Sequence, residues 1–363
     1  MSPRILVWFW SGGGGGSQFA ARLTHRLSLR FGADRVALSM RADDPTLDAA
    51  RRHGLSVRPA DIVSDRRRPL ATAASLMRGA RVLAEHARDA DVVIAAMNFA
   101  TAAPLALTLR KPLVYCAHDP APHPGDYAVS MQKTTQAALL KRADAVVALS
   151  RFVADELGRA LSPAKLHTAP LSSVFAPREA PRRRHLGPTR MLFLGRMIDY
   201  KGVDILADAL TRIEGRNDWR LTVAGHGPAL TPALVSRLSA TPGVDVLAGW
   251  LSDAEIAALL EEHDVLVAPY RSASQSGVVA EALAAGLPCV VTPVGALVEQ
   301  IGEGAGGWIA RGTAPDAFAA ALSAALADPA AISGKAEGAL ALARAAWEAP
   351  YWDWLDRTWG PPN

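Results

Sequence analysis

Short apolar segments alternate along the chain with longer stretches in which apolar residues recur every three or four positions. In the first half the apolar segments are 5–10, 36–40, 92–96, 113–116 and 145–149, and in the second half 191–194, 221–224, 244–247, 264–269 and 289–292. Between the first two, residues 19–31 place Phe19, Leu23, Leu27 and Phe31 on one helical face. This alternation predicts βαβ units, and therefore parallel sheets with helices on both faces.

The alternation is interrupted once. Residues 169–189 are rich in Pro and Arg and lack periodicity, and the strand–helix pattern restarts after them. Because 363 residues exceed one typical core, we predict two doubly wound domains, 1–170 and 171–345. The aromatic, amphipathic C-terminal segment 346–363 is expected to form a helix that packs back on the first domain, and the alternatives are docking across both domains or contact with a membrane surface. The arginines at 182–184 are expected to form a solvated linker, with anion binding as the alternative.

Residues 264–288 predict a buried strand, a polar loop and a helix. Ser276 is the expected N-cap and Gly277 the first helical residue, which leaves the N–H groups of Gly277, Val278 and Val279 without intrahelical acceptors. Such N–H groups, at the positive end of the helix dipole, form an anion site. Gly286, followed by Pro288, is expected to end this helix after about three turns.

Glu281 is the only charge in that helix, whose other residues are mostly Val and Ala. A buried carboxylate needs a partner, because burying it alone costs several kcal/mol. It either reaches the surface or an arginine, or it binds a ligand, and this segment alone does not distinguish the two.

Two further helices are expected to begin with capping boxes, Ser252 with Glu255 and Thr313 with Asp316.

Composition limits the cellular setting and the partners. The net charge of +4 does not argue for nucleic acid. Cys116 and Cys289 lie in separate apolar segments, which predicts buried free thiols in a reducing compartment and no cysteine metal cluster. The apolar run 5–10 is too short for a signal peptide, and no run approaches the roughly 18 residues of a spanning helix. We therefore expect a cytoplasmic protein.

Five glycines at 12–16 separate the first predicted strand from the first helix. Glycine there permits close approach of the backbone, including Gly15 and Gly16, to a ligand at the helix start. The spacing does not match a dinucleotide-binding fingerprint, because Ser17 stands where the third glycine should be. An unspecialised flexible loop is the alternative.

His118 and Asp119 directly follow the apolar segment 113–116 and open a proline-rich turn. Ligands of open α/β sheets bind at the carboxyl ends of strands, so this position favours a functional pair over a surface histidine. His123, in the same turn, is expected to be structural.

Gly195, Arg196, Lys201 and Gly202 follow the first strand of the second domain. Two cations within six residues at a strand end suit a pyrophosphate, since Arg offers a planar fork and Lys a point charge. Lys201 is one of only six lysines among 39 basic residues. Alone this segment is also compatible with a solvated loop. Together with the helix start at Gly277, it predicts a phosphate site.

These motifs together resemble the retaining glycosyltransferases of family 4, which have the GT-B fold of two Rossmann-like domains facing each other across a cleft. The resemblance is strongest over 191–301. It rests on Gly195, Arg196, Lys201 and Gly202; on Ala224, Gly225, Gly227 and Pro228; on the run 249–269; and on Glu281, Ala282, Ala284, Gly286, Pro288 and Val290.

The resemblance implies roles for single residues. Arg196 and Lys201 would hold and stabilise the leaving diphosphate, and the N–H groups of Gly277 and Val278 would bind the same phosphates. Glu281 would bind the ribose hydroxyls, and His118 would contact the transferred sugar. The family retains anomeric configuration and needs no bound metal, which agrees with the lack of a clustered metal motif in the sequence.

One position departs from the family pattern. Members often carry a second acid eight residues before the ribose-binding Glu, where this chain has Ala273. Recognition of the sugar must then come from elsewhere, and Gln275, Ser276 or backbone N–H groups are the candidates.

The sequence therefore predicts a hexosyltransferase that uses UDP- or GDP-sugars without a cofactor. Its acceptor would be a glycan or a lipid-linked molecule of a bacterial polysaccharide or glycolipid pathway, reached at the inner face of the cell membrane, with no nucleic-acid partner. The alternatives are a sugar-nucleotide epimerase, which the spacing of Arg196 and Lys201 disfavours, and a non-catalytic nucleotide-sugar-binding protein, which Ala273 keeps open.

Overall fold

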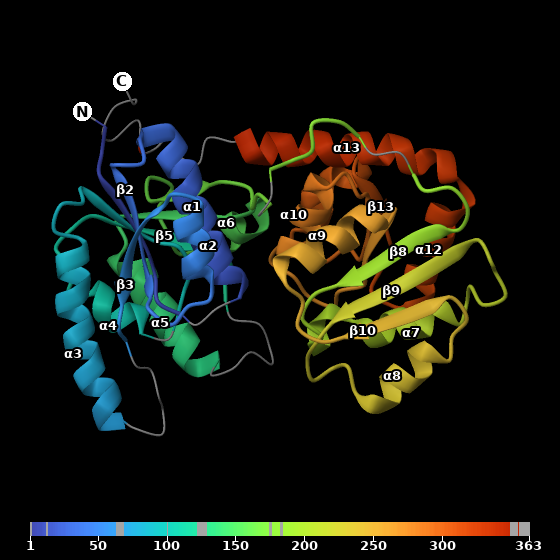
Figure 1. The fold of residues 1–363 in the computed structure, drawn as a ribbon, viewed down its shortest axis with the longest axis horizontal. Coiled ribbons are helices and arrows are strands. Elements are labelled where there is room, and N and C mark those ends of the chain that lie inside the picture. Colours follow the sequence, from blue (N-terminus) through green and yellow to red (C-terminus); the bar gives the residue numbers. More distant parts are fainter. Residues whose placement is uncertain are drawn as a thin grey trace. The chain divides into compact units, whose positions relative to one another are not determined.

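The computed structural model describes residues 2–11, 14–62, 69–99, 101–121, 129–173, 176–181, 184–348 and 355. The chain divides into two compact units, residues 1–169 and residues 170–349 (Figure 1). The division falls within one residue of the sequence-based boundary, and each unit is a doubly wound α/β structure as predicted.

The first unit has a seven-stranded sheet of parallel strands in the order β3-β2-β1-β4-β5-β6-β7. Its strands are β1 (Ile5–Phe9), β2 (Val36–Arg41), β3 (Ser56–Ala60), β4 (Val92–Ala95), β5 (Leu113–Ala117), β6 (Ala145–Ala148) and β7 (Leu166–Thr168). Its helices are α1 (Gly15–Phe31), α2 (Thr46–Arg52), α3 (Pro69–His86), α4 (Ala102–Ala106), α5 (Val129–Arg142) and α6 (Arg151–Gly158).

The second unit has a six-stranded parallel sheet in the order β10-β9-β8-β11-β12-β13. Its strands are β8 (Thr189–Leu194), β9 (Trp219–Gly225), β10 (Val244–Ala248), β11 (Val265–Ala268), β12 (Cys289–Val291) and β13 (Gly307–Ile309). Its helices are η1 (Asp199–Lys201), α7 (Val203–Leu210), α8 (Pro232–Ser239), α9 (Asp253–Glu262), α10 (Gly277–Ala284), α11 (Leu297–Gln300), η2 (Gly302–Gly304), α12 (Pro315–Ala327) and α13 (Pro329–Glu348).

All ten apolar segments singled out in the sequence form strands, and three further strands were missed. β3 and β7 are edge strands with mostly exposed or half-buried residues, so their pattern is not apolar. β13 has three residues and begins with Gly307. Edge strands are solvated on more sides than central ones, which removes the apolar signal used to find strands.

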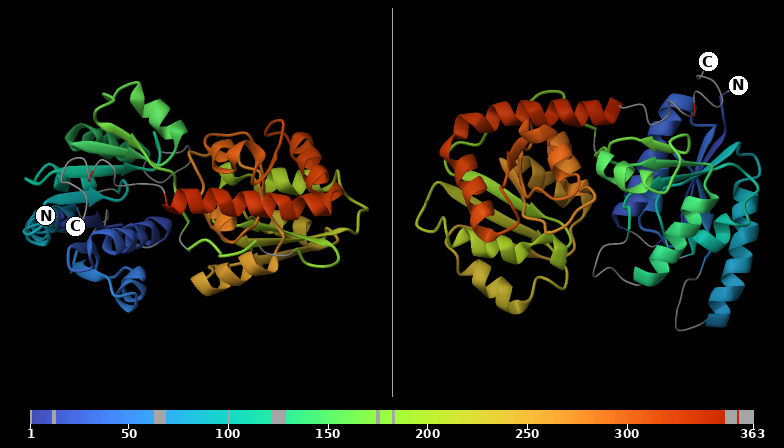
Figure 2. Two further views of the ribbon diagram at one scale, coloured as in Figure 1. Left: turned by 90° about the horizontal axis from the view of Figure 1, so that it is seen from above. Right: turned by 180° about the vertical axis from the view of Figure 1, so that it is seen from behind.

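Alternation along β8 divides the second core into two layers. Met191 and Phe193 belong to the cluster that includes α7 and α12, whereas Leu192 and Leu194 belong to the cluster that includes α10 and α13. Successive strand residues point to opposite faces, so one apolar strand supplies both layers. Figure 2 shows α13 running along the second unit, where it contacts α10.

The predicted helix termini are only partly correct. Ser252 and Glu255 form a complete capping box at α9. The box predicted at Thr313 is wrong, because α12 begins at Pro315 after Ala314, which makes no side-chain cap. Proline at the first helical position needs no N–H acceptor, so the helix starts there without a polar cap.

The structure describes both cysteines as free and buried, as predicted. Among the described residues no single helix is long and apolar enough to span a membrane, although α12 and α13, joined at 101°, meet the criteria of length and composition together. The predictions for Gly12, Gly13, His123, Arg182, Arg183 and the segment from 349 onward, apart from Leu355, lie outside the described residues.

Candidate functional site

The loops that follow β8 and β11 meet at the carboxyl edge of the second sheet, because these strands are neighbours. Gly202 lies between them with φ 67°, and a Cβ there would stand 2.0 Å from the carbonyl oxygen of Pro269. The Arg271 N–H donates to the Tyr200 carbonyl at 2.7 Å. The two loops are thus joined through their backbones, and only glycine fits at 202.

Lys201 is buried at this junction, with 8% of its surface exposed. Its Nζ donates to the Tyr270 hydroxyl at 2.8 Å and lies 4.5 Å from the centre of the Tyr270 ring. No carboxylate among the residues described lies within salt-bridge distance of it. A buried cation is costly unless an anion compensates it. This ammonium is therefore suited to an anionic ligand.

Arg196 is exposed on the same loop, and none of its side-chain nitrogens bonds to a described residue. Arg271 differs: its guanidinium pairs with both carboxylate oxygens of Asp204 and donates to the Asp199 carbonyl. That pairing holds the pKa of Asp204 below its usual range. Arg271 serves the loop structure, and Arg196 is the arginine that remains available to a ligand.

Helix α10 begins as predicted, with Ser276 as N-cap and Gly277 as first residue. The Val279 N–H is occupied by the Ser276 Oγ at 3.3 Å, so the prediction that it is free is wrong. In the described part of the chain, nothing accepts from the N–H groups of Gly277 and Val278. Eight residues make this helix about two turns long rather than three.

Close approach brings the two halves of the predicted site together. A Cβ on Gly195 would stand 3.3 Å from Cγ2 of Val278 and 3.5 Å from Nζ of Lys201. The cation and the start of α10 therefore flank the same glycine. A side chain at 195 would fill the space between them.

Packing and helix capping explain some of the other residues that were predicted to bind the donor, but not all of them. Glu281 and Gln275 are buried, with 8% and 6% exposed. Ser276 uses its hydroxyl to cap α10, which makes it a poor candidate for reading the sugar. Gly225 has φ 137°, and a Cβ there would meet the Gly195 carbonyl oxygen at 1.9 Å, so packing alone demands glycine.

Two residues of this edge were missed from the sequence. Tyr270 is 2% exposed and contacts Lys201. The Gln300 side-chain amide bonds both backbone groups of Ser276: its Oε1 accepts from the N–H at 2.7 Å and its Nε2 donates to the carbonyl at 3.1 Å. Neither residue has a sequence signature, because both act through partners distant along the chain.

In the first unit His118 directly follows β5, at the strand end where it was expected. Its Nδ1 lies 3.4 Å from Oδ2 of Asp119, and both side chains are partly exposed. The Asp119 carbonyl accepts from Nε2 of Gln136 at 2.5 Å, which fixes this corner. Burial, aided by Asp119, raises the pKa of Tyr115.

Gly15 and Gly16 are the first two residues of α1, which therefore starts four residues earlier than predicted. A Cβ on Gly16 would stand 2.5 Å from Cζ of Phe9, whereas Gly15 has no heavy atom within 4 Å of such a Cβ. Packing explains glycine at 16. It does not explain glycine at 15, which stays available for close approach of a ligand.

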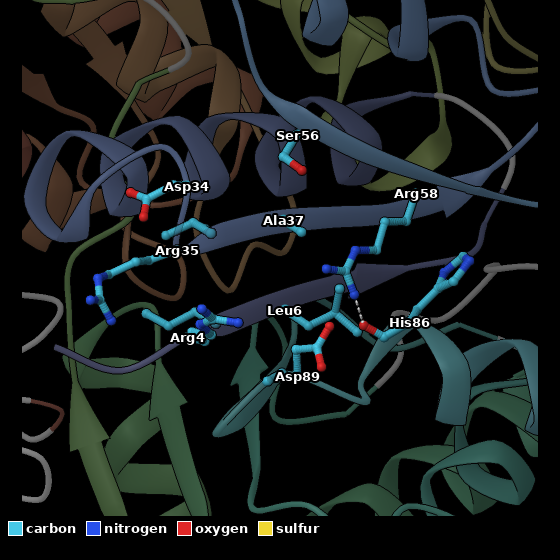
Figure 3. A pocket seen from close by; sticks show the side chains of 12 residues that line it. Arg4, Leu6, Asp34, Arg35, Ala37, Ser56, Arg58, His86 and Asp89 are labelled. Carbon is cyan, nitrogen blue, oxygen red and sulfur yellow. Dashed lines mark hydrogen bonds between the residues drawn. The ribbon is translucent and has the colours of Figure 1, made fainter. Parts of the chain in front are cut away.

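A cavity of about 60 Å³ lies at the other edge of the first sheet, beside the starts of β1 and β2 (Figure 3). Arg4, Arg35 and Arg58 line it, but their guanidinium groups do not converge in the view of Figure 3. Arg35 donates to the Ser2 carbonyl and Arg58 to the His86 carbonyl. The cavity therefore lacks the arrangement seen at Lys201, where a buried cation lies beside a helix start.

Two family models match the chain. "Glycosyltransferase Family 4" matches residues 13–171, and "Glycosyl transferases group 1" matches residues 188–328. The chain belongs to the family 4, group 1 glycosyltransferases. The matched ranges include His118 in the first unit and Arg196, Lys201 and Glu281 in the second.

The chain is also similar to enzymes that have been named. The chain of this glycosyltransferase is 29% identical over 249 residues to the MMP alpha-(1->4)-mannosyltransferase of Mycolicibacterium hassiacum, covering 62% of this chain and 59% of the relative. The match to the glycogen synthase of Mycobacterium tuberculosis covers 50% of that protein at 31% identity. This chain thus matches little more than half the length of these relatives.

The fold is that of GT-B proteins. Anabaena Alr3699/HepE, solved in complex with UDP and glucose, superposes with a TM-score of 0.72 at 18% identity, covering 94% of each chain. Identity this low shows the fold and leaves the substrate open.

Proposed function

We propose that this protein transfers a sugar, with retention of configuration, from a nucleotide-diphosphate sugar to a glycan or lipid-linked acceptor of bacterial polysaccharide or glycolipid synthesis. The observation that carries the proposal is the Lys201 ammonium, buried without a carboxylate among the described residues and close to the start of α10. A diphosphate supplies the anion that this arrangement lacks.

The reaction breaks the bond between the sugar's anomeric carbon and the diphosphate, and forms a bond from that carbon to the acceptor oxygen. Negative charge grows on the departing diphosphate. Lys201, Arg196 and the N–H groups of Gly277 and Val278 would stabilise it where it develops. In a front-face reaction the acceptor proton passes to the departing phosphate oxygen, and the new bond forms on the face that the leaving group vacates.

The rest of the donor has candidate contacts at the same sheet edge. Glu281 would accept hydrogen bonds from the ribose hydroxyls. Trp250, after β10, is 70% exposed and its ring lies 5.2 Å from that of His226, so it offers an aromatic face to a nucleobase. His118 of the first unit would contact the transferred sugar, as in the family that this chain belongs to.

The similarity to named proteins favours a hexosyl donor. The Mycolicibacterium hassiacum relative is named a mannosyltransferase, and HepE was solved with UDP and glucose. Under this proposal the donor base is uracil or guanine. We further propose that the enzyme acts in the cytoplasm at the inner face of the membrane, and that it needs no metal, since cations and helix N–H groups supply the positive charge. Turnover should then persist in EDTA.

The direct test is to incubate the protein with UDP- and GDP-sugars and with glycan or lipid-linked acceptors, and to measure release of nucleoside diphosphate and the anomeric configuration of the product. Acceptor-dependent release with retention supports the proposal. Interconversion of the nucleotide-sugar without an acceptor would instead indicate an epimerase. Tight donor binding without turnover against the whole acceptor panel would indicate a binding protein.

A further inference from the structure

We infer that Tyr270 and Gln300 are positioning residues, which hold Lys201 and the first N–H groups of α10 together as one preorganised anion site. This inference rests on the proposed function, because the anion it concerns is the donor diphosphate. Neither residue belongs to the motifs that identified the family. Both contact Ser276, Tyr270 at its hydroxyl and Gln300 at its backbone N–H and carbonyl.

Tyr270 connects the cation to the helix cap. Its hydroxyl accepts from Nζ of Lys201 at 2.8 Å and lies 3.3 Å from Oγ of Ser276. The backbone of the same residue is also tied, because the Thr292 hydroxyl donates to the Tyr270 carbonyl at 2.5 Å. With both ends held, the tyrosine fixes where the ammonium points.

Gln300 holds the cap residue itself. Its amide forms one bond to the N–H and one to the carbonyl of Ser276, which comes 24 positions earlier in the chain. Ser276 keeps an extended conformation, with φ −132° and ψ 120°, as an N-cap requires. That conformation sets the direction of the Gly277 and Val278 N–H groups, so Gln300 acts on the site without touching the ligand.

The arrangement has a consequence that a purely structural role lacks. Groups of the anion site that are held in place before binding lose little conformational freedom when the anion binds. If these groups are misplaced, the affinity for the phosphates falls and the affinity for the nucleoside does not. The proposed nucleoside contacts, Glu281 and Trp250, have no bond to Tyr270 or Gln300 among those described, so affinity for the nucleoside should change less. The ratio of nucleoside diphosphate affinity to nucleoside affinity therefore reports positioning.

The experiment compares wild type with Tyr270→Phe, Gln300→Ala and the double variant by calorimetric titration with UDP, GDP, the matching nucleosides and inorganic pyrophosphate. Thr222→Val is the matched control: it also removes a partly buried hydroxyl bond of the second unit, here to Nε2 of His263. Thermal midpoints without ligand show whether each variant is folded. Gln300 is half-buried, so Gln300→Ala provides the test even if Tyr270→Phe unfolds.

For Tyr270→Phe we expect diphosphate affinity to fall about 10-fold or more, since the lost bond involves a charged group, and for Gln300→Ala about 5-fold. Nucleoside affinity should change less than about 2-fold, and the double variant should lose less than the product of the single effects, because both act through Ser276. Thr222→Val should bind like wild type.

Equal losses for nucleoside and nucleoside diphosphate, or unchanged diphosphate binding in folded variants, would overturn the positioning role while leaving the proposed function intact. A wild-type protein that binds neither UDP, GDP nor pyrophosphate would instead overturn the proposed function, and this inference with it.

Discussion

The two units share a topology but present different chemistry at the carboxyl edges of their sheets. Both sheets run third, second, first, fourth, fifth and sixth strand in order, with a seventh added in the first unit. After β1 the first unit has consecutive glycines in its sequence, and helix α1 starts at Gly15 without a side-chain cap. After β8 the second unit has Arg196 and Lys201 and a loop locked against Pro269.

This difference shows that topology supplies a place for a ligand and that side chains decide which ligand. Parallel strands bring loops together at one edge whatever their sequence. At the second edge a buried cation and a capped helix lie together, and we propose that they form an anion site. At the first edge Gly15 offers open backbone, and His118 with Asp119 offers a polar corner. The second unit is therefore the one suited to a diphosphate.

The largest expected effect comes from removing the cation. Lys201→Ala should lower kcat about 10²–10³-fold, since it removes charge stabilisation that grows in the transition state. Lys335→Ala is the matched control, because Lys335 is the other lysine of the second unit and donates to the Gly304 carbonyl. Steady-state kinetics with a saturating acceptor measure both. Equal, small effects of the two substitutions would mean that the diphosphate site has been misplaced.

Glu281→Ala should act on binding more than on turnover. If the carboxylate accepts from ribose hydroxyls, its loss should raise the KM for the donor about 10-fold or more and change kcat less. Glu281→Gln, which keeps the volume, separates charge from packing. A fall in kcat alone, with donor KM unchanged, would contradict the ribose assignment.

Gly202 is the position at which a substitution should disrupt the packed loops at the carboxyl edge of the second sheet. Gly202→Ala introduces a Cβ into the Pro269 carbonyl, so it should destabilise the protein by about 1–3 kcal/mol beyond the strain of a positive φ. Gly215→Ala is the control for backbone strain alone. Gly215 has φ 84°, but a Cβ there would have no heavy atom within 4 Å. Urea unfolding compares the two variants, and equal losses of stability would show that the loops are not locked together.

The first edge is tested by the pair Gly15 and Gly16. Gly16→Ala should destabilise the protein because its Cβ meets Phe9. Gly15→Ala should preserve or raise stability, by up to about 1 kcal/mol, since alanine favours a helix. If Gly15→Ala nevertheless lowers turnover, backbone approach of a ligand is supported. Unchanged turnover would favour the flexible-loop interpretation.

The smallest expected effect is the contribution of His263 to the change of folding stability with pH. Burial lowers the pKa of His263, whose ring bonds the Leu259 carbonyl and the Thr222 hydroxyl. The unfolded chain takes up this proton first, so the stability that neutral His263 contributes is present above about pH 6.5 and is lost as the pH falls through the folded pKa. Unfolding free energies at pH 7.5 and 5.5 should differ less in His263→Gln than in wild type. A control with exposed His53→Gln should behave like wild type.

Much of this architecture was predictable because it depends on local patterns. Apolar strands such as β8 and β11 are continuous in sequence, and capping at Ser252 and Ser276 depends on residues three positions apart. The edge strands β3 and β7 were not found, because half-exposed strands lack that pattern. The capping box predicted at Thr313 does not form, because α12 begins two residues later at Pro315, which has no N–H group to be capped.

The sequence by itself determined the alternation that makes two parallel sheets, and the motifs of the family 4 glycosyltransferases with Arg196, Lys201 and Glu281 at strand ends and helix starts. Only the tertiary structure decided that Lys201 is buried against Tyr270 and that Gln300 holds Ser276. The physical reason is distance along the chain. Periodicity and capping act within a few residues, whereas the Lys201–Tyr270 bond joins residues 69 positions apart and the Ser276–Gln300 bond joins residues 24 positions apart.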